Sequence, residues 1–212
     1  YYRVVAFTTG GYSAASAAAS IAVVAAPGAP AGLAATILSA SNVRLSWTAG
    51  TGVPTGYVLQ RSTSATFATV TSYNLGASAT SYTNTTAAAG NTYYYRLAAT
   101  NAAGTSAYSA TATAAVLVPT TPTGLAYVVS TGPSVVLSWV NGATVPQTGI
   151  VIQRATNPGF TQGLATYNVA ANATTYTDAT AAAATTYFYR IAATNVVGTS
   201  LYSASVQVAV AF

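Results

Sequence analysis

The chain has 212 residues, of which 6 are basic and 1 is acidic, and its formal net charge is +5. Cysteine and histidine are absent, which excludes disulfides, thiolate metal sites and a histidine general base. Asp178 is the single carboxylate, so a paired-carboxylate mechanism cannot be assembled within the chain. The composition therefore predicts a protein that is not an enzyme and that holds no cofactor and no catalytic or metal site.

Charged residues make up 3% of the chain, whereas ordinary globular proteins carry about 25%. One explanation is a low-charge surface whose solubility rests on hydroxyls, assembly or glycans. The other is a sequence in which flexible Lys, Glu and Asp side chains have been assigned as Ala, Thr or Ser. The six arginines are scattered rather than clustered, so we expect no nucleic-acid partner. No segment reaches the roughly 18 apolar residues of a membrane span, so none is predicted.

One motif organises the chain. The run Tyr93–Gly104 returns 94 residues later as Tyr187–Gly198, and a truncated copy opens the chain at Tyr1–Gly11. Each copy alternates between two faces and ends in an Asn…Gly turn, except that the first copy lacks the Asn. This pattern predicts a central strand in each of two modules, preceded by the end of another.

Residues 1–26 align with Tyr94–Pro119 and predict two strands, Tyr1–Thr8 and Ala15–Val24. Two strands cannot close a sandwich and are marginal alone. We expect the strands that complete this unit to lie upstream in the same polypeptide, with donation by another chain as the alternative.

The first complete module is predicted at residues 27–117, after the proline-bounded linker Pro27–Pro30. Further strands are expected at Val43–Trp47, Gly56–Arg61, Thr69–Leu75, Ser81–Thr83, from Tyr93 onward, and at Ala107–Leu117. Alternation places Trp47, Tyr57, Tyr93 and Tyr95 in the core.

The second module, residues 118–212, repeats this plan after a second proline-bounded linker, Val118–Pro122. Its expected core residues are Trp139, Ile150, Tyr187 and Tyr189. Seven short strands in roughly 93 residues, with turn signals at each join, are typical of an antiparallel Greek-key sandwich. The predicted fold class is therefore all-β, with tandem seven-stranded immunoglobulin-like sandwiches.

The Pro-x-x-Pro entry, Trp47 and Trp139 on the second strand, and the Tyr-x-Tyr-Arg…Asn-x-x-Gly-x-Ser-x-x-Ser run resemble fibronectin type III domains. The resemblance covers nearly the whole chain and is closest to modules of prokaryotic secreted and surface proteins. It implies that these Trp residues, Tyr93 and Tyr187 are core residues, with the Tyr hydroxyl capping a nearby loop. No Arg-Gly-Asp triplet is present, so the integrin-binding loop of the animal adhesion members has no counterpart.

Some repeated residues admit a functional interpretation. Tyr94, Phe188, Arg96 and Arg190 form outward stripes that could stack sugars or bases, although cross-strand and cation–π packing explains them more simply. The repeated pairs Gln60-Arg61 and Gln153-Arg154 are interpreted as marking a strand edge.

Asn84 and Asn172 fit the N-glycan acceptor pattern, which is also expected by chance in a Thr-rich chain. Asn84 and Asp178 occupy matching places before a turn, where a short polar side chain bonds its own backbone. Such bonding explains both residues without a metal.

The sequence predicts a non-enzymatic extracellular or cell-surface protein, structural or adhesive, whose serial modules form part of a filament, sheath or stalk. Its expected partners are other copies of itself or neighbouring modules, with a glycan as a further candidate. Two alternatives stay open. One is an accessory spacer or binding module of a secreted carbohydrate-active enzyme, and the other is a phage virion decoration or tail protein.

Overall fold

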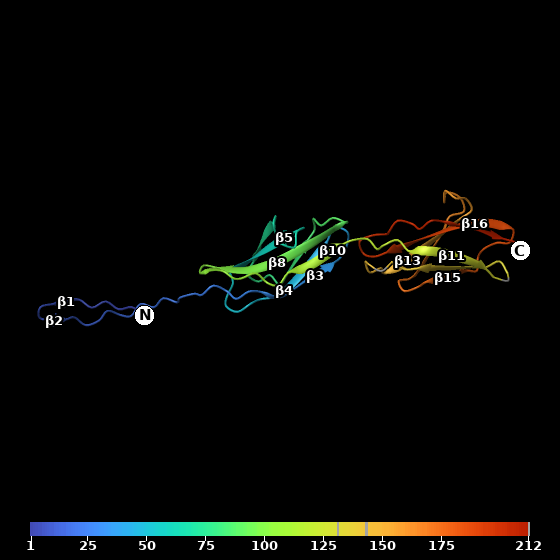
Figure 1. The fold of residues 1–212 in the computed structure, drawn as a ribbon. Coiled ribbons are helices and arrows are strands. Elements are labelled where there is room, and N and C mark those ends of the chain that lie inside the picture. Colours follow the sequence, from blue (N-terminus) through green and yellow to red (C-terminus); the bar gives the residue numbers. More distant parts are fainter. Residues whose placement is uncertain (131, 143, 212) are drawn as a thin grey trace.

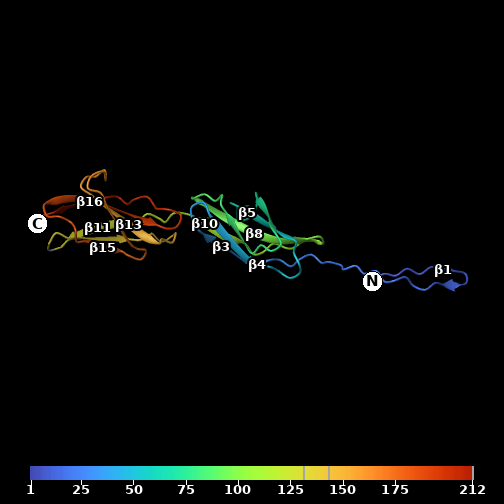
Figure 2. The same cartoon turned by 180° about the vertical axis from the view of Figure 1, so that it is seen from behind.

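The computed structural model describes residues 1–130, 132–142 and 144–211. Within these ranges all regular elements are β-strands. A narrow hairpin and two sandwich modules follow one another in a line, with the C-terminus at the end away from the hairpin (Figures 1 and 2). The chain therefore forms an elongated molecule whose modules meet end to end.

The first module packs a three-stranded sheet on a larger sheet. The smaller sheet has the order β3-β4-β7, and the larger has β10-β8-β5-β6 with the short β9 paired to β8; all of these pairings are antiparallel. The strand bounds are β3 Ala31–Ile37, β4 Val43–Thr48, β5 Gly56–Ser62, β6 Thr71–Gly76, β7 Ser81–Asn84, β8 Asn91–Asn101, β9 Gly104–Thr105 and β10 Ala112–Val116.

The second module repeats this arrangement with sheets β11-β12-β15 and β14-β13-β16-β17. Its strand bounds are β11 Thr123–Val129, β12 Val135–Val140, β13 Gly149–Ala155, β14 Ala165–Ala170, β15 Thr175–Asp178, β16 Thr185–Thr194 and β17 Val206–Val210. The predicted fold class, all-β with tandem β-sandwiches, is confirmed; the second module has seven strands, and the first has the same seven together with the two-residue β9.

The sequence alternation explains why the sheets face each other. In β4, Val43, Leu45 and Trp47 are buried and the residue after each of them is exposed, because successive side chains point to opposite faces of a strand. The first strand of each module contains an irregularity at a glycine. Gly32 and Gly124 have φ values of +64° and +65° at the register shift of β3 and β11, a conformation that glycine adopts without steric cost.

The last strand of the first module is shorter than predicted. We expected Ala107–Leu117, but β10 begins at Ala112. The stretch before it is held to β8 through serine: Ser106 and Ser109 donate their backbone N–H groups to Ala99 and Leu97. Their hydroxyls accept the backbone N–H groups of the same two residues, at 2.9 and 3.2 Å. A hydroxyl here replaces a strand carbonyl as the acceptor.

The N-terminal hairpin also differs from the prediction of two full strands. Regular pairing is confined to β1, Phe7–Thr8, and β2, Gly11–Tyr12, with one further bridge between Tyr2 and Ala19. Tyr2 and Val4, which match the buried Tyr95 and Leu97, are 72% and 75% exposed. In the described chain no second sheet covers this face, so the hairpin has no core to extend its pairing.

Candidate functional site

The eight residues predicted for the core lie inside the two modules, each at most 6% exposed. They divide between two separate clusters. The first contains Trp47, Tyr57, Tyr93 and Tyr95, and the second contains Trp139, Ile150, Tyr187 and Tyr189.

Near the start of each central strand, a tyrosine hydroxyl caps a nearby turn. Tyr93 Oη accepts the backbone N–H of Ala88 at 3.1 Å, and Tyr187 Oη accepts that of Ala182 at 3.2 Å. These bonds satisfy backbone groups at the turn into the strand, and they give the two residues a structural role.

A buried ionic cluster joins the two sheets of the second module, since Asp178 lies in β15 whereas Arg154 and Tyr189 lie in β13 and β16. The Asp178 carboxylate is fully buried and accepts hydrogen bonds from Arg154 Nη1 at 2.7 Å and from Tyr189 Oη at 2.8 Å. Thr180 donates both its backbone N–H and its hydroxyl to the same carboxylate, at 2.9 and 2.7 Å. Arg154 also lies over the Tyr187 ring, with 4.6 Å to the centroid. All oxygens of the carboxylate are therefore engaged.

These contacts set the protonation of the cluster. Burial alone would raise the pKa of Asp178, but the hydrogen bonds from Thr180, Tyr189 and Arg154 outweigh it and lower the pKa below its ordinary value. Burial and then the bond to the carboxylate raise the pKa of Tyr189 above that of an ordinary tyrosine. At neutral pH the cluster is a fixed ion pair, which suits a structural role better than proton transfer.

The first module has a neutral version of this cluster. Asn84 stands at the position of Asp178. Its Oδ1 accepts a hydrogen bond from Arg61 Nη1 at 3.2 Å, and its Nδ2 donates one to Tyr95 Oη at 2.7 Å. Thr86 donates to the Asn84 carbonyl through its backbone and its hydroxyl. The predicted bond from Asn84 and Asp178 to their own turn is thus present, together with a long-range Arg and Tyr that the sequence pattern did not reveal.

The outward arginines are enclosed by aromatic rings. Arg96 lies between Phe67 and Tyr108, at 4.2 and 4.1 Å from the ring centroids. Its Nε donates to Gln60 Oε1 at 2.8 Å. We call these residues the first arginine stack. The rings cover both faces of the guanidinium, so this geometry is cation–π packing between an arginine of β8 and aromatic residues from two segments outside the strands.

The second arginine stack repeats the first. Arg190 lies between Phe160 and Tyr202, at 4.0 and 4.2 Å, and donates to Gln153 Oε1 at 2.9 Å. Sequence reasoning found the arginines but not Phe160 or the two tyrosines of the Ser-x-x-Ser run. Their signal was available, since these aromatic residues recur at equivalent places in both modules.

The interpretation of Gln60-Arg61 and Gln153-Arg154 as strand-edge markers is wrong. Both pairs lie in β5 and β13, which are interior strands paired on both sides. Each glutamine accepts a hydrogen bond from the stacked arginine on the neighbouring strand. Each arginine of the pair donates instead to a buried side chain, Arg61 to Asn84 and Arg154 to Asp178. Alternation along the strand sends the two members of each pair to opposite faces.

The asparagines of the two glycan-acceptor sequences differ in solvent exposure. Asn84 is fully buried and its amide is hydrogen-bonded to Tyr95, so it is unavailable in the folded module. Asn172 is exposed on the turn between β14 and β15.

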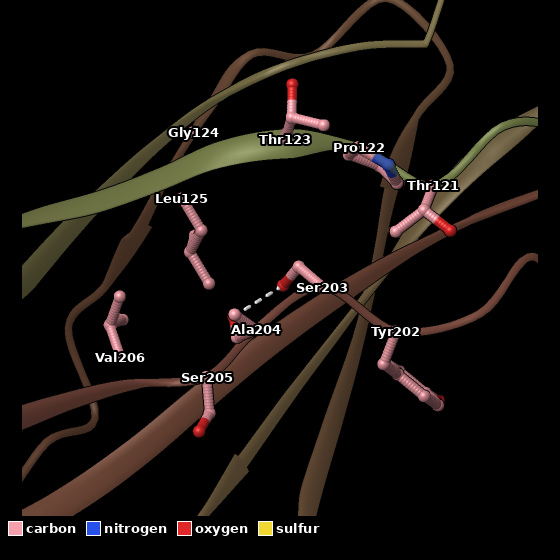
Figure 3. Close-up of a pocket in the computed structure, with 10 residues that line it drawn as sticks. All are labelled: Thr121, Pro122, Thr123, Gly124, Leu125, Tyr202, Ser203, Ala204, Ser205 and Val206. Atoms are coloured by element: carbon pink, nitrogen blue, oxygen red, sulfur yellow. Dashed lines mark hydrogen bonds between the residues drawn. The ribbon is translucent and has the colours of Figure 1, made fainter.

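A shallow groove of about 460 Å³ runs between β11 and the segment that leads into β17 (Figure 3). Leu125 points from β11 toward Ser203 and Ala204, while Thr123 points away. The lining combines threonine and serine residues with apolar ones, among them Pro122, Leu125 and Val206, and it includes Tyr202. Such a groove offers hydrogen bonds and apolar contact but no acid–base pair.

In the part of the chain that the structure describes, no group of three His, Cys, Asp or Glu could hold a metal ion. The same ranges contain no helix long and apolar enough to cross a membrane. What the geometry provides is packing surface, stacked cations and open strand edges.

Residues 28–115 match the family model described as fibronectin type III domain. The first module is thus a fibronectin type III domain, and the second repeats its strand order. No curated protein matches the chain.

The solved structures that resemble the chain include two multi-domain segments. The chicken CNTN1 FN1–FN3 domains share 18% identity over 99% of this chain and 75% of that chain, with a TM-score of 0.48. A two-domain fibronectin type III segment of chicken tenascin shares 17% identity over 85% of this chain and 98% of that chain, with a TM-score of 0.43.

Proposed function

We propose that the chain is a non-enzymatic structural or adhesive protein of the extracellular space or cell surface. Its serial modules would form part of a filament, sheath or stalk, and its main partners would be other copies of itself. The observation that carries this proposal is the end-to-end row of proline-bounded modules, whose length grows by repetition (Figure 1). The prokaryotic surface type belongs to the same proposal and rests on the motif resemblance.

Open sheet edges support association between copies. β6 and β14 each pair on one side, and their sequences, Thr-Ser-Tyr-Asn-Leu-Gly and Ala-Thr-Tyr-Asn-Val-Ala, contain neither charge nor proline. Natural proteins usually protect such edges with lysine, proline or a covering segment. Unprotected edges of this kind can add a strand from another chain.

Sedimentation velocity over a range of concentrations tests the proposal. We expect the wild-type chain to form larger species as concentration rises, and the double variant Asn74→Lys/Asn168→Lys to stay monomeric, because both positions are exposed on the open edges. Asn172→Lys adds one of the same charges on a turn and should still associate. A wild-type chain that is monomeric at every concentration would contradict self-assembly.

The location of the chain is tested separately. Fractionation of the source cells should recover it from the surface or the medium. Recovery within an intact phage particle, or joined to a catalytic domain that degrades polysaccharide, would favour one of the two alternatives instead.

A further inference from the structure

The loop that follows each central strand contacts the linker that enters its own module. In the second module Asn195 Nδ2 donates to Leu117 O at 2.9 Å and to Pro146 O at 3.3 Å. The other end of the same amide, Asn195 Oδ1, accepts the backbone N–H groups of Val197 and Gly198. One side chain thus joins the residue just before the linker, a neighbouring loop and its own turn.

The same contacts occur at the entrance of the first module. Asn101 Nδ2 donates to Ala25 O at 2.8 Å and to Val53 O at 3.4 Å, and Asn101 Oδ1 accepts the Ala103 N–H. Ala25 and Leu117 precede the linker prolines Pro27 and Pro119 by the same two residues. Because the acceptors are backbone carbonyls, the contact does not depend on the linker side chain.

A glycine lets the linker approach the loop. A Cβ added at Gly198 would lie 3.3 Å from Val118 Cγ1, and one added at Gly104 would lie 3.7 Å from the Ala26 Cβ. The first contact is tighter than a comfortable van der Waals distance, and both place the residue before the linker proline against the loop. Pro27 and Pro119 are themselves buried at these positions.

At the second junction the loop also reaches the preceding module. Val197 packs against the core cluster of the first module. A hollow of about 230 Å³ remains between Ile37 and Leu117 of the first module and Pro146 and Val196 of the second. The first module has Ala102 and Ala103 where the second has Val196 and Val197, so its entrance offers less apolar surface.

We propose that the Asn-x-x-Gly loop is a linker clamp, a docking surface for the C-terminal end of a preceding module of the same fold. The asparagine fixes the linker backbone, and the residue two positions later sets how firmly the preceding module is held. The junction at Leu117 is accordingly stiffer than the junction at Ala25. This inference concerns the module junction and stands whether or not the chain forms filaments.

The test measures the distance between the two modules in the full chain. The chain contains no cysteine, so Thr113→Cys on β10 and Thr177→Cys on β15, both exposed, give unique sites for spin labels. Pulsed electron paramagnetic resonance then reports the distance distribution. Asn195→Asp is the informative variant, because its carboxylate still accepts the turn N–H groups but cannot donate to Leu117 and Pro146.

We expect Asn195→Asp to widen the distribution about twofold or more, since modules without a firm interface move relative to each other. Asn101→Asp makes the same change at the other junction and should leave this distance distribution unchanged. Val197→Ala, which gives the second loop the residue of the first, should widen it while leaving the Asn195 hydrogen bonds to Leu117 and Pro146 in place. If Asn195→Asp and Val197→Ala both retain the wild-type width while Trp139 fluorescence in a Trp47→Phe background shows a folded second module, the inference is overturned.

Discussion

At the end of the short strands β7 and β15, the two modules differ at one buried polar position: Asn84 carries an amide where Asp178 carries a carboxylate. Each is surrounded by equivalent partners, Arg61, Tyr95 and Thr86 in one module and Arg154, Tyr189 and Thr180 in the other. The modules thus contain the same buried site in a neutral and an ionised form, and the chain provides its own control.

The first prediction concerns acid stability. The pKa of Asp178 is lowered in the folded state, so at pH values between this lowered pKa and the ordinary aspartate pKa of about 3.9 the folded module binds fewer protons than the unfolded chain. The stabilisation is present above the ordinary pKa and is lost as the pH falls through the folded pKa. We expect the denaturant midpoint of the second module to fall in acid, and that of the first to stay constant.

Each module contains one tryptophan, so Trp47→Phe and Trp139→Phe backgrounds leave one fluorescent reporter at a time. Asp178→Asn should remove the acid dependence of the second module. An acid-sensitive first module, or an acid-sensitive Asp178→Asn variant, would show that another group is responsible.

A second residue-scale prediction comes from the tryptophans themselves. Trp139 Nε1 donates to Asn141 at 2.9 Å, whereas Trp47 Nε1 is buried without a partner. Ala49 stands where Asn141 does, two residues after the tryptophan. Ala49→Asn should stabilise the first module by about 1 kcal/mol, the net contribution of one hydrogen bond.

Urea unfolding of the Trp139→Phe background, followed by Trp47 fluorescence, measures this gain. Ala29→Asn, a substitution of the same type at an exposed linker position, serves as its control. Equal midpoints for Ala49→Asn and its parent would contradict the account.

At the scale of elements, serine hydroxyls accept backbone hydrogen bonds from the central strand in the segment that precedes the last strand of each module. Ser200 accepts the buried N–H of Ala193 at 3.0 Å, and Ser203 accepts that of Ile191 at 3.2 Å. In the hairpin, Ser13 and Ser16 make the corresponding bonds to Ala6 and Val4 without any sandwich around them. The bonding pattern is therefore encoded locally by the Ser-x-x-Ser spacing.

The third prediction follows from these bonds. Ser200→Ala leaves the buried Ala193 N–H without its acceptor and should cost about 1–3 kcal/mol of unfolding free energy. Ser205→Ala, at an exposed position of the same segment, should be within about 0.5 kcal/mol of wild type. Both are measured by Trp139 fluorescence in the Trp47→Phe background. Similar losses for the two variants would contradict the proposed role of Ser200.

The strand positions followed from alternation of apolar and polar residues, because a half-buried strand imposes a period of two. The arginine stacks could not be predicted in full. They depend on Phe67 and Phe160, which adopt a φ of +55° in loops, and loop conformation leaves no periodic signal in the sequence. The strand-edge interpretation of the Gln-Arg pairs failed for a related reason, since strand order in a sheet is a property of long-range pairing.

At the scale of the whole molecule, the hairpin and the modules differ in how far their aromatic side chains are buried. Tyr1, Phe7 and Tyr12 of the hairpin are each at least 77% exposed. The aromatic residues at the centre of the modules, such as Tyr95 and Tyr189, are fully buried. Susceptibility to proteolysis should therefore change sharply along the chain.

The fourth prediction is that chymotrypsin cleaves after Phe7 and Tyr12 first and leaves a stable fragment that contains both modules. Mass spectrometry of a digestion time course measures the order of cleavage. Early cuts within β8 or β16 would contradict the described packing. A hairpin that survives as long as the modules would show instead that another surface covers it.

The sequence by itself determined the number of modules, their all-β character and the residues of their cores, because these depend on short-range alternation and on the repeat. Only the tertiary structure decided which partners the polar residues find. Arg61 lies 23 residues from Asn84, and Asn195 lies 78 residues from Leu117. Such contacts form only after both sheets are packed and the modules are joined, and a one-dimensional pattern does not encode these distances.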